Sequence, residues 1–314
     1  MKQQLQYILI PHPDDEFSAW SLIQDSTENY PVFILLTHGE ATGMCDGHGL
    51  QVDLGERVPQ PQPFTGTHTA NCGAQRLDSW HAFLDGMAEI DSRLDSPALV
   101  GTVEGFELRV GEQSARAVFD GGDGRLSPLF VTDALQTVRR HRDRFPVQRE
   151  YGVIGAAYYN DRYPGAWRYT HPDHLAVHRA LFDTDQGLPG PQWGLTAHSD
   201  PDAAPPHGRI GQTSPDVFAA AMSVAPDGQR TGIFQRAYGW LGFWPGDGRW
   251  PAHETDAEPG VSRSQTFWER FGARGRVAPP APGGGASSPT TTTPAPTAST
   301  ATTMTLGWPG RSGC

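Results

Sequence analysis

Two His-Pro-Asp motifs contain residues that could bind a metal ion. The first lies in PHPDDE (11–16) and the second in HPDH (171–174). An imidazole and a carboxylate three residues apart, as in His12 and Asp15, can face the same point across a turn, and this pair suits Zn²⁺ or another borderline divalent ion. A catalytic zinc site usually has three protein ligands, so we expect the second motif to supply the third.

Both motifs follow segments that are typical of buried strands. Residues 7–10 (YILI) are a continuous apolar run, and a second run (151–159) precedes HPDH. Similar patterns predict one more strand and several helices, namely a strand at 31–37 and helices at 15–24, 74–90, 131–141 and 174–183. This alternation predicts an α/β fold, Rossmann-like with three layers and a mostly parallel sheet. Ligands of such sheets bind beyond the carboxyl ends of the strands, where both motifs would lie.

The remaining segments are rich in loop-forming residues. Residues 38–73 and 184–230 contain many Gly, Pro and polar residues without an apolar period, so we expect long functional loops over the C-terminal edge of the sheet. The segment 277–314 is rich in Pro, Thr and Ser and has almost no large apolar residues that could form a core. We therefore predict one domain over 1–276 and a disordered tail over 277–314, with a linker as the alternative interpretation of the tail.

Composition excludes some classes of partner. The chain has 314 residues and a formal net charge of -11, which disfavours binding to nucleic acid. No segment approaches the roughly 18 apolar residues of a membrane span, and the N-terminal apolar run is too short for a secretory signal. Three cysteines are too few for a disulfide framework. These observations predict a cytoplasmic protein that binds neither nucleic acid nor a membrane; they do not predict its oligomeric state.

The motifs occur in the order known from one enzyme family. PHPDDE follows a predicted strand, THGE (37–40) follows the next strand, and HPDH comes later. In this respect the chain resembles the PIG-L/LmbE-like N-acetylglucosaminyl deacetylases. The resemblance covers roughly residues 5–185, with 262–271 as a further segment.

The resemblance implies a metal site and a base. By motif position, His12, Asp15 and His174 would bind the metal, and Asp14 would be the general base that activates the attacking water. The residue chemistry agrees, because a divalent cation offsets the repulsion among neighbouring acids and lowers the pKa of a bound water to about 7. A carboxylate beside it can take a proton and return it to a leaving amine.

The resemblance also implies roles for four further residues. His171 would stabilise the tetrahedral intermediate, either protonated or as a hydrogen-bond donor, and Asp173 would orient a neighbouring histidine. Tyr169 matches a tyrosine near the substrate carbonyl. Arg76 resembles an arginine that contacts sugar hydroxyls.

These roles together imply a metal-dependent hydrolase. It would remove an N-acetyl or N-acyl group from an amino sugar or a small glycoconjugate, and tailoring of a secondary metabolite is one such step. A non-catalytic sugar-binding protein and an amidase acting on a non-sugar amide are alternatives. A dinucleotide-binding enzyme is disfavoured, because residues 7–20 contain no glycine for a phosphate-binding turn and three acids that would repel phosphate.

Simpler interpretations of the motif residues are also open. Asp14 could cap a helix, and His171 could begin a capped helix with Pro172 at its first position. His178, four residues after His174, could be a surface residue or a donor behind the ligands, and we leave it out of the metal set.

Arg76 and Tyr169 also have simpler interpretations. Tyr169 could serve packing alone. Arg76 could pair with Asp78 or Glu40, and we expect Glu40 to be structural.

The cysteines of the first long loop could form a second site. Cys45 and His48, with His68 and Cys72, have the spacing of zinc ligands, and a Cys45–Cys72 disulfide is the other possible staple. We prefer two unrelated pairs. Two Asp-Gly segments lack the acids of a calcium loop and are predicted to be turns; they are DGGDGR (120–125) and WPGDGRW (244–250).

Overall fold

The computed structural model describes the greater part of the first 270 residues. The described residues are 2–42, 45, 69–157, 171–195, 208–222, 232–238 and 264–270. They belong to one compact unit, Met1–Arg270. The predicted tail over 277–314 lies outside the described residues. Among the helices in the described part of the chain, none combines the length and the apolar character that crossing a membrane requires.

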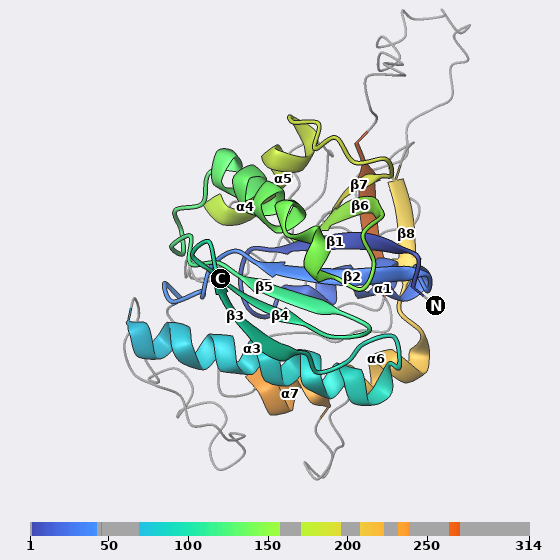
Figure 1. Ribbon diagram of the computed structural model, residues 1–314. Coiled ribbons are helices and arrows are strands. Elements are labelled where there is room, and N and C mark those ends of the chain that lie inside the picture. Colours follow the sequence, from blue (N-terminus) through green and yellow to red (C-terminus); the bar gives the residue numbers. More distant parts are fainter. Residues whose placement is uncertain are drawn as a thin grey trace, which may run out of the picture. The chain divides into compact units, whose positions relative to one another are not determined.

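The described strands form one nine-stranded sheet in the order β3-β4-β5-β2-β1-β6-β7-β9-β8 (Figure 1). Their bounds are β1 Gln4–Ile10, β2 Asn29–Leu35, β3 Ala98–Val103, β4 Phe106–Val110, β5 Ala115–Val118, β6 Glu150–Gly155, β7 Gln192–Leu195, β8 Gly208–Gln212 and β9 Ser264–Glu269. The central strands β5, β2, β1, β6 and β7 run parallel, whereas antiparallel pairs lie towards both edges. Because β1 lies beside both β2 and β6, the segments that follow these strands meet at one edge of the sheet.

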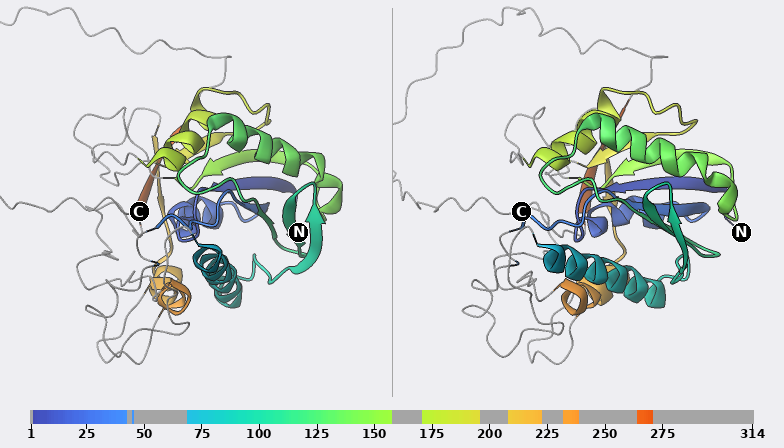
Figure 2. Two further views of the ribbon diagram at one scale, coloured as in Figure 1. Left: turned by 90° about the vertical axis from the view of Figure 1, so that its left-hand side faces the viewer. Right: turned by 60° about the vertical axis from the view of Figure 1, so that its left-hand side comes forward.

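Helices cover both faces of the sheet, as Figures 1 and 2 show. On one face lie α4 (Pro128–Arg140) and α5 (Pro172–Phe182). The other face carries α1 (Trp20–Asp25), which follows a 3₁₀ turn at Glu16–Ala19, together with α3 (Ala70–Ile90), α6 (Pro215–Met222) and α7 (Ile233–Tyr238). A second 3₁₀ turn, Arg142–Arg144, follows α4. The predicted α/β fold with three layers and a mostly parallel sheet is therefore confirmed.

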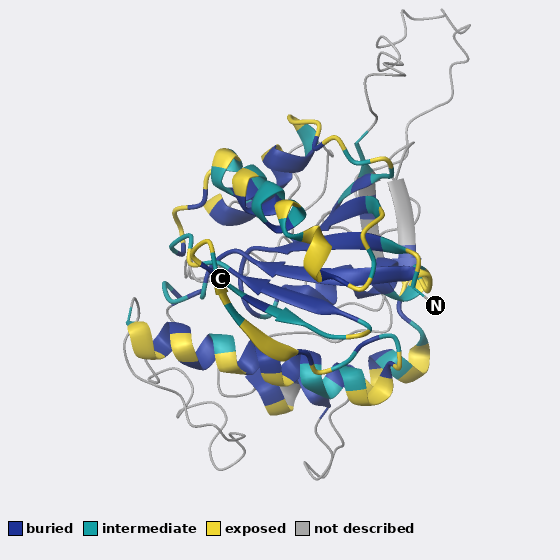
Figure 3. Ribbon diagram, viewed as in Figure 1, coloured by how far each residue is buried: buried dark blue, intermediate teal, exposed yellow. Residues whose placement is uncertain are grey.

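Successive side chains along the central strands point alternately into two hydrophobic cores, one on each face of the sheet. On β1, Ile8 packs into the core that contains Trp80 of α3, whereas Leu9 packs into the opposite core with Leu135 of α4. Figure 3 shows the central strands buried and the outer faces of the helices exposed. Burial on both faces explains why the continuous apolar runs of the sequence form the middle of a parallel sheet.

Several elements differ from the prediction. The predicted loop 184–230 is wrong in part, because it contains β7, β8 and α6. The strands β3, β4 and β5 were not predicted. The segments of β4 and β5 are short and mix apolar with charged residues, and β3 is an edge strand whose Leu99 and Val100 are exposed. Such strands lack the continuous apolar run of a buried parallel strand.

A disulfide joins Cys45 to Cys72, with a Cα–Cα distance of 5.8 Å. Our preferred interpretation of two unrelated cysteine–histidine pairs is therefore wrong. His48 and His68 lie outside the described residues. Both cysteines are fully buried in the core beside α3, and Cys72 lies in the first turn of that helix. The bond thus fixes the start of α3 to the segment that follows THGE.

Replacing both cysteines, as in Cys45→Ala/Cys72→Ala, should lower the free energy of unfolding by about 3–4 kcal/mol, because the unfolded chain gains conformational entropy when the bond is absent. The bond closes a loop with a sequence separation of 27 residues. Urea unfolding followed by circular dichroism measures the change. Cys314→Ala is the matched control and should leave the stability unchanged. The unreduced, denatured wild-type chain should release one titratable thiol of its three cysteines; three would contradict the bond.

Candidate metal centre

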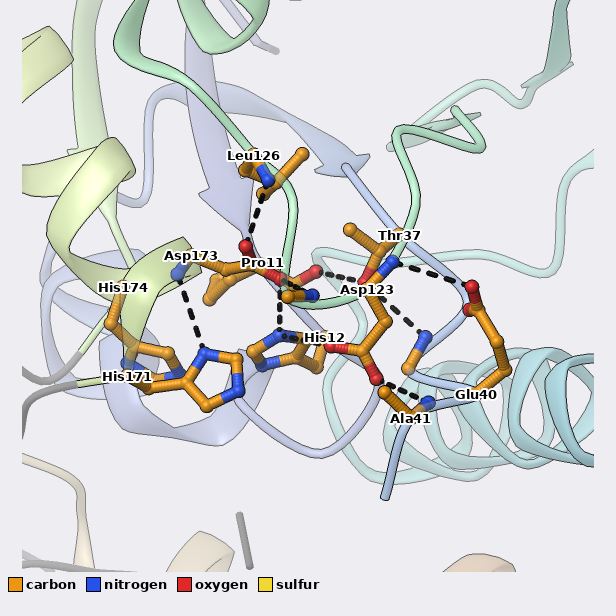
Figure 4. Close-up of polar contacts among 12 residues, drawn as sticks. Pro11, His12, Thr37, Glu40, Ala41, Asp123, Leu126, His171, Asp173 and His174 are labelled. Atoms are coloured by element: carbon orange, nitrogen blue, oxygen red, sulfur yellow. Dashed lines mark hydrogen bonds and ion pairs between the residues drawn. The ribbon is translucent and has the colours of Figure 1, made fainter. Parts of the chain in front are cut away.

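The candidate site lies at the carboxyl edge of the sheet, where three motif-bearing segments meet. PHPDDE follows β1, THGE follows β2, and HPDH begins α5. Thr37 joins the first two, because its Oγ1 donates a hydrogen bond to the carbonyl oxygen of Pro11 (2.8 Å) and accepts one from the Gly39 amide (3.2 Å). Figure 4 shows the resulting cluster of His12, His171 and His174 beside Asp173.

The three predicted metal ligands converge. His12 Nδ1 lies 3.3 Å from Asp15 Oδ2, and His174 Nε2 lies 3.2 Å from the same oxygen. One ligand atom from each residue lies within 4.8 Å of the others, and all three side chains are buried. Two imidazole nitrogens and one carboxylate oxygen form the donor set of many catalytic zinc sites.

The charge of the site also fits a cation. Burial alone would lower the pKa of His12, but three carboxylates raise it well above its usual range; they belong to Asp123, Asp15 and Asp173. Burial would raise the pKa of Asp15, but His174 and His12 hold it below its usual range. The residues thus favour positive charge at the point where the ligand atoms converge, and a divalent ion would satisfy the same demand.

Asp173 ties the ligands to the loop after β5. Its carboxylate accepts hydrogen bonds from the amides of Gly124 (2.7 Å) and Leu126 (2.9 Å) and lies 3.0 Å from His12 Nε2. Because an ionised carboxylate only accepts hydrogen bonds, Nε2 of His12 carries a hydrogen, which leaves Nδ1, the nitrogen that faces Asp15, as the one that could bind an ion. This contact is the one that the implied orienting role of Asp173 requires, and the role itself stays a prediction.

Asp123 is a site residue that the sequence analysis missed. Its Oδ1 lies 3.2 Å from His12 Nε2, and its Oδ2 accepts a hydrogen bond from the Ala41 amide (2.7 Å). The Asp123 amide donates to Glu40 Oε1 (3.3 Å), in keeping with the structural role expected for Glu40. The sequence of DGGDGR predicts only a turn. The available signal was its position after a strand at the same edge, but that strand, β5, was not predicted.

Asp14 has an unusual backbone conformation. Its φ is 97°, which is rare for a residue other than glycine. The Asp14 amide donates a hydrogen bond to Glu16 Oε2 (3.0 Å). Burial raises the pKa of the Asp14 carboxyl to about 7, although Arg76 opposes this shift. The alternative of a helix cap is not supported, because the 3₁₀ turn starts after Asp15 and has no side-chain cap.

Arg76 contacts Asp14 from α3. Its Nη2 donates hydrogen bonds to the carbonyl oxygen of Pro13 (2.6 Å) and to Asp14 Oδ2 (3.2 Å). The alternative pairing of Arg76 with Asp78 or Glu40 is therefore wrong, since its ion pair is with Asp14. Its predicted contact with a substrate stays a prediction.

His171 caps α5 and also faces the candidate metal centre. Its Nδ1 accepts a hydrogen bond from the Asp173 amide (3.3 Å), with Pro172 at the first helical position. The simpler interpretation of His171 as the start of a capped helix is therefore confirmed, and its role in stabilising the tetrahedral intermediate stays a prediction. Burial, with His12 and His174, lowers the pKa of His171 to about 4. In the neutral form the hydrogen then lies on Nε2, since Nδ1 accepts.

The predictions for Tyr169 and His178, which flank the HPDH motif, have different outcomes. Tyr169 lies outside the described residues. His178 is buried and stacks on Phe182, with ring centroids 4.4 Å apart, so its interpretation as a surface residue is wrong.

Comparison with known proteins found no matching family model and no similar curated protein. Three similar solved structures each cover 85% of this chain and 97% of their own. They are a triple mutant of a deacetylase of the teicoplanin biosynthetic pathway (Orf2*T; TM-score 0.41, 16% identity), a deacetylase–bog complex of that pathway (0.40, 15%) and the zinc-inhibited form of teicoplanin deacetylase Orf2 (0.37, 14%). At these TM-scores the likeness carries no argument about the function of this chain.

Asp173→Asn should weaken zinc binding about 10–100-fold, because an amide cannot accept from two backbone donors and His12 at once. Competition with a chromophoric chelator measures the affinity. Asp185, three residues beyond the end of α5, has a side chain that is 57% exposed, so Asp185→Asn is the control and should bind zinc as the wild type does. A folded Asp173→Asn variant with unchanged affinity would contradict the role of Asp173.

Proposed function

We propose that this chain is a metal-dependent hydrolase that removes an N-acetyl or N-acyl group from an amino sugar or a small glycoconjugate. The observation that carries the proposal is the convergence of His12, Asp15 and His174 within 4.8 Å, buried at the carboxyl edge of the sheet. Asp14, a carboxylate with a raised pKa, immediately precedes Asp15 in the chain.

The metal ligands would be His12 Nδ1, Asp15 and His174 Nε2. Zn²⁺ is the ion that this donor set favours, and another divalent transition metal is compatible with it. When bound, such an ion supplies Lewis acidity, which polarises an amide carbonyl and makes water acidic enough to deprotonate near neutral pH.

The remaining residues would move protons and stabilise charge. Asp14 would take a proton from the attacking water and deliver it to the leaving amine, which are steps that a carboxylate beside the ion can perform. His171 donates from Nε2 to the carbonyl oxygen as negative charge develops on it, which is typically worth about 3–4 kcal/mol. Asp173 holds His12 in the tautomer that leaves Nδ1 free to bind.

The sugar part of the substrate rests on the motif resemblance. Tyr169 beside the substrate carbonyl, the single domain over 1–276 and a place in secondary-metabolite tailoring are further parts of the proposal. A non-catalytic sugar-binding protein would bind the amino sugar without releasing acetate, and an amidase would prefer non-sugar amides. A panel of substrates therefore separates the three functions.

Purified protein with one equivalent of Zn²⁺ should release acetate from N-acetylated amino sugars. Removal of the metal with EDTA should abolish turnover, and added zinc should restore it, because the three ligands serve one ion. An acetate assay across N-acetylglucosamine conjugates and non-sugar acetamides measures both points. Turnover that survives complete metal removal would refute the metal-dependent mechanism.

Substitutions should separate metal binding from proton transfer. His12→Ala and His174→Ala should lose zinc and activity together, since each removes a ligand. Asp14→Asn should keep one zinc per chain and lose about 10²–10⁴-fold in kcat, because an amide cannot accept the proton. Metal analysis and initial rates on the same preparations give the result. A near-native rate for Asp14→Asn would show that another group is the base.

A further inference from the structure

We infer that Arg76 is a positioning residue, which holds the carboxylate of Asp14 in its reactive orientation, and that Gly39 of THGE provides the space for its guanidinium group. This inference rests on the proposed function, because it concerns the proposed base. It differs from the substrate-binding role that the motif resemblance implied for Arg76.

The backbone conformation at Asp14 needs external support. A residue with a Cβ rarely adopts a φ of 97°, so the surrounding contacts must hold it there. One support is Glu16, whose Oε2 accepts from the Asp14 amide while its Oε1 accepts from the buried hydroxyl of Tyr238 (2.7 Å). The second support is Arg76, which contacts both the carbonyl oxygen of Pro13 and the carboxylate of Asp14 through one nitrogen.

Arg76 is placed to support Asp14 rather than to contact a substrate. Its side chain is 2% exposed, whereas the side chain of Asp14 is 12% exposed. A guanidinium group so deeply buried has little surface to offer a sugar hydroxyl. The disulfide at Cys72, one helical turn earlier, further fixes the part of α3 from which Arg76 extends.

Gly39 is required by this arrangement. A Cβ built on Gly39 would lie 2.8 Å from Arg76 Cζ and closer still to Nε, and the φ of Gly39 is 67°. The guanidinium group cannot easily move away from such a Cβ, because it is buried and hydrogen-bonded to the Pro13 carbonyl oxygen and to Asp14. Gly39 would therefore affect the proposed general base, Asp14, indirectly, by leaving room for the guanidinium group of Arg76.

Kinetics of Arg76→Gln and Gly39→Ala distinguish positioning from substrate binding. A positioning role predicts that kcat falls about 100-fold, as expected for a misplaced catalytic group, while KM stays within about twofold and zinc stoichiometry is unchanged. A rise in KM with an unchanged kcat would instead assign Arg76 to the substrate and overturn the inference. Guanidinium ion added to Arg76→Gly should restore part of the lost kcat without changing KM.

Arg116→Gln is the matched control. Arg116 is equally buried and is paired with Asp85 (2.7 Å), but the contacts of its side chain are with α3 and the segment before β3 rather than with the motifs. This variant should lose stability and keep the wild-type kcat of its folded fraction. An equal loss of kcat in Arg116→Gln would show that any buried arginine has this effect, and would overturn the inference.

A measurement that does not depend on turnover completes the test. Crystal structures of the zinc-loaded wild type and of Arg76→Gln should show Asp14 leaving its positive φ, or its carboxylate turning away, only in the variant. An unmoved Asp14 would overturn the inference even if the wild type hydrolysed every substrate. Lack of turnover in the wild type, with Asp14 displaced in the variant, would refute the proposed function and leave the positioning role standing.

Discussion

Burial of several carboxylates around one imidazole is the constraint on which the rest of the structure depends. Asp15, Asp123 and Asp173 all approach His12 within 3.3 Å, and Asp14 is half-buried next to Asp15 in the chain. Buried charges of like sign are costly unless positive charge and hydrogen-bond donors offset them. The fold supplies the guanidinium group of Arg76 and the backbone amides at Ala41, Gly124 and Leu126. An ion at His12, Asp15 and His174 would supply the remaining positive charge.

The parallel sheet makes this concentration of charge feasible. Strands β1, β2, β5 and β6 are neighbours although their segments are far apart in the sequence, and their carboxyl ends deliver the motifs to one edge. Asp173 is the clearest connection, since it joins the start of α5 to the loop after β5 and to His12 in the turn after β1. The two hydrophobic cores on either side hold the strands in this register.

The sequence predicts those parts of the molecule whose signal is local. The continuous apolar runs of β1, β2 and β6 mark the middle of the sheet, and the His-Pro-Asp motifs mark the ligands that converge on it. Asp123 escaped prediction because its importance comes from a neighbour, β5, that is too short to show a pattern. The partner of Arg76 was also missed, because an ion pair between α3 and the turn after β1 depends on tertiary packing. The cysteine pairing was likewise open, because spacing alone allows a metal site, a bridge or neither.

The bridge between Cys45 and Cys72 bears on where and how this protein can be made. Disulfides persist in oxidising compartments and are rare in the cytosol, where thiols are kept reduced. The bond therefore weighs against the cytoplasmic location, which stays a prediction. A recombinant host that folds the chain in a reducing cytosol would produce α3 without its covalent link to Cys45, so the choice of expression compartment becomes part of obtaining the native protein.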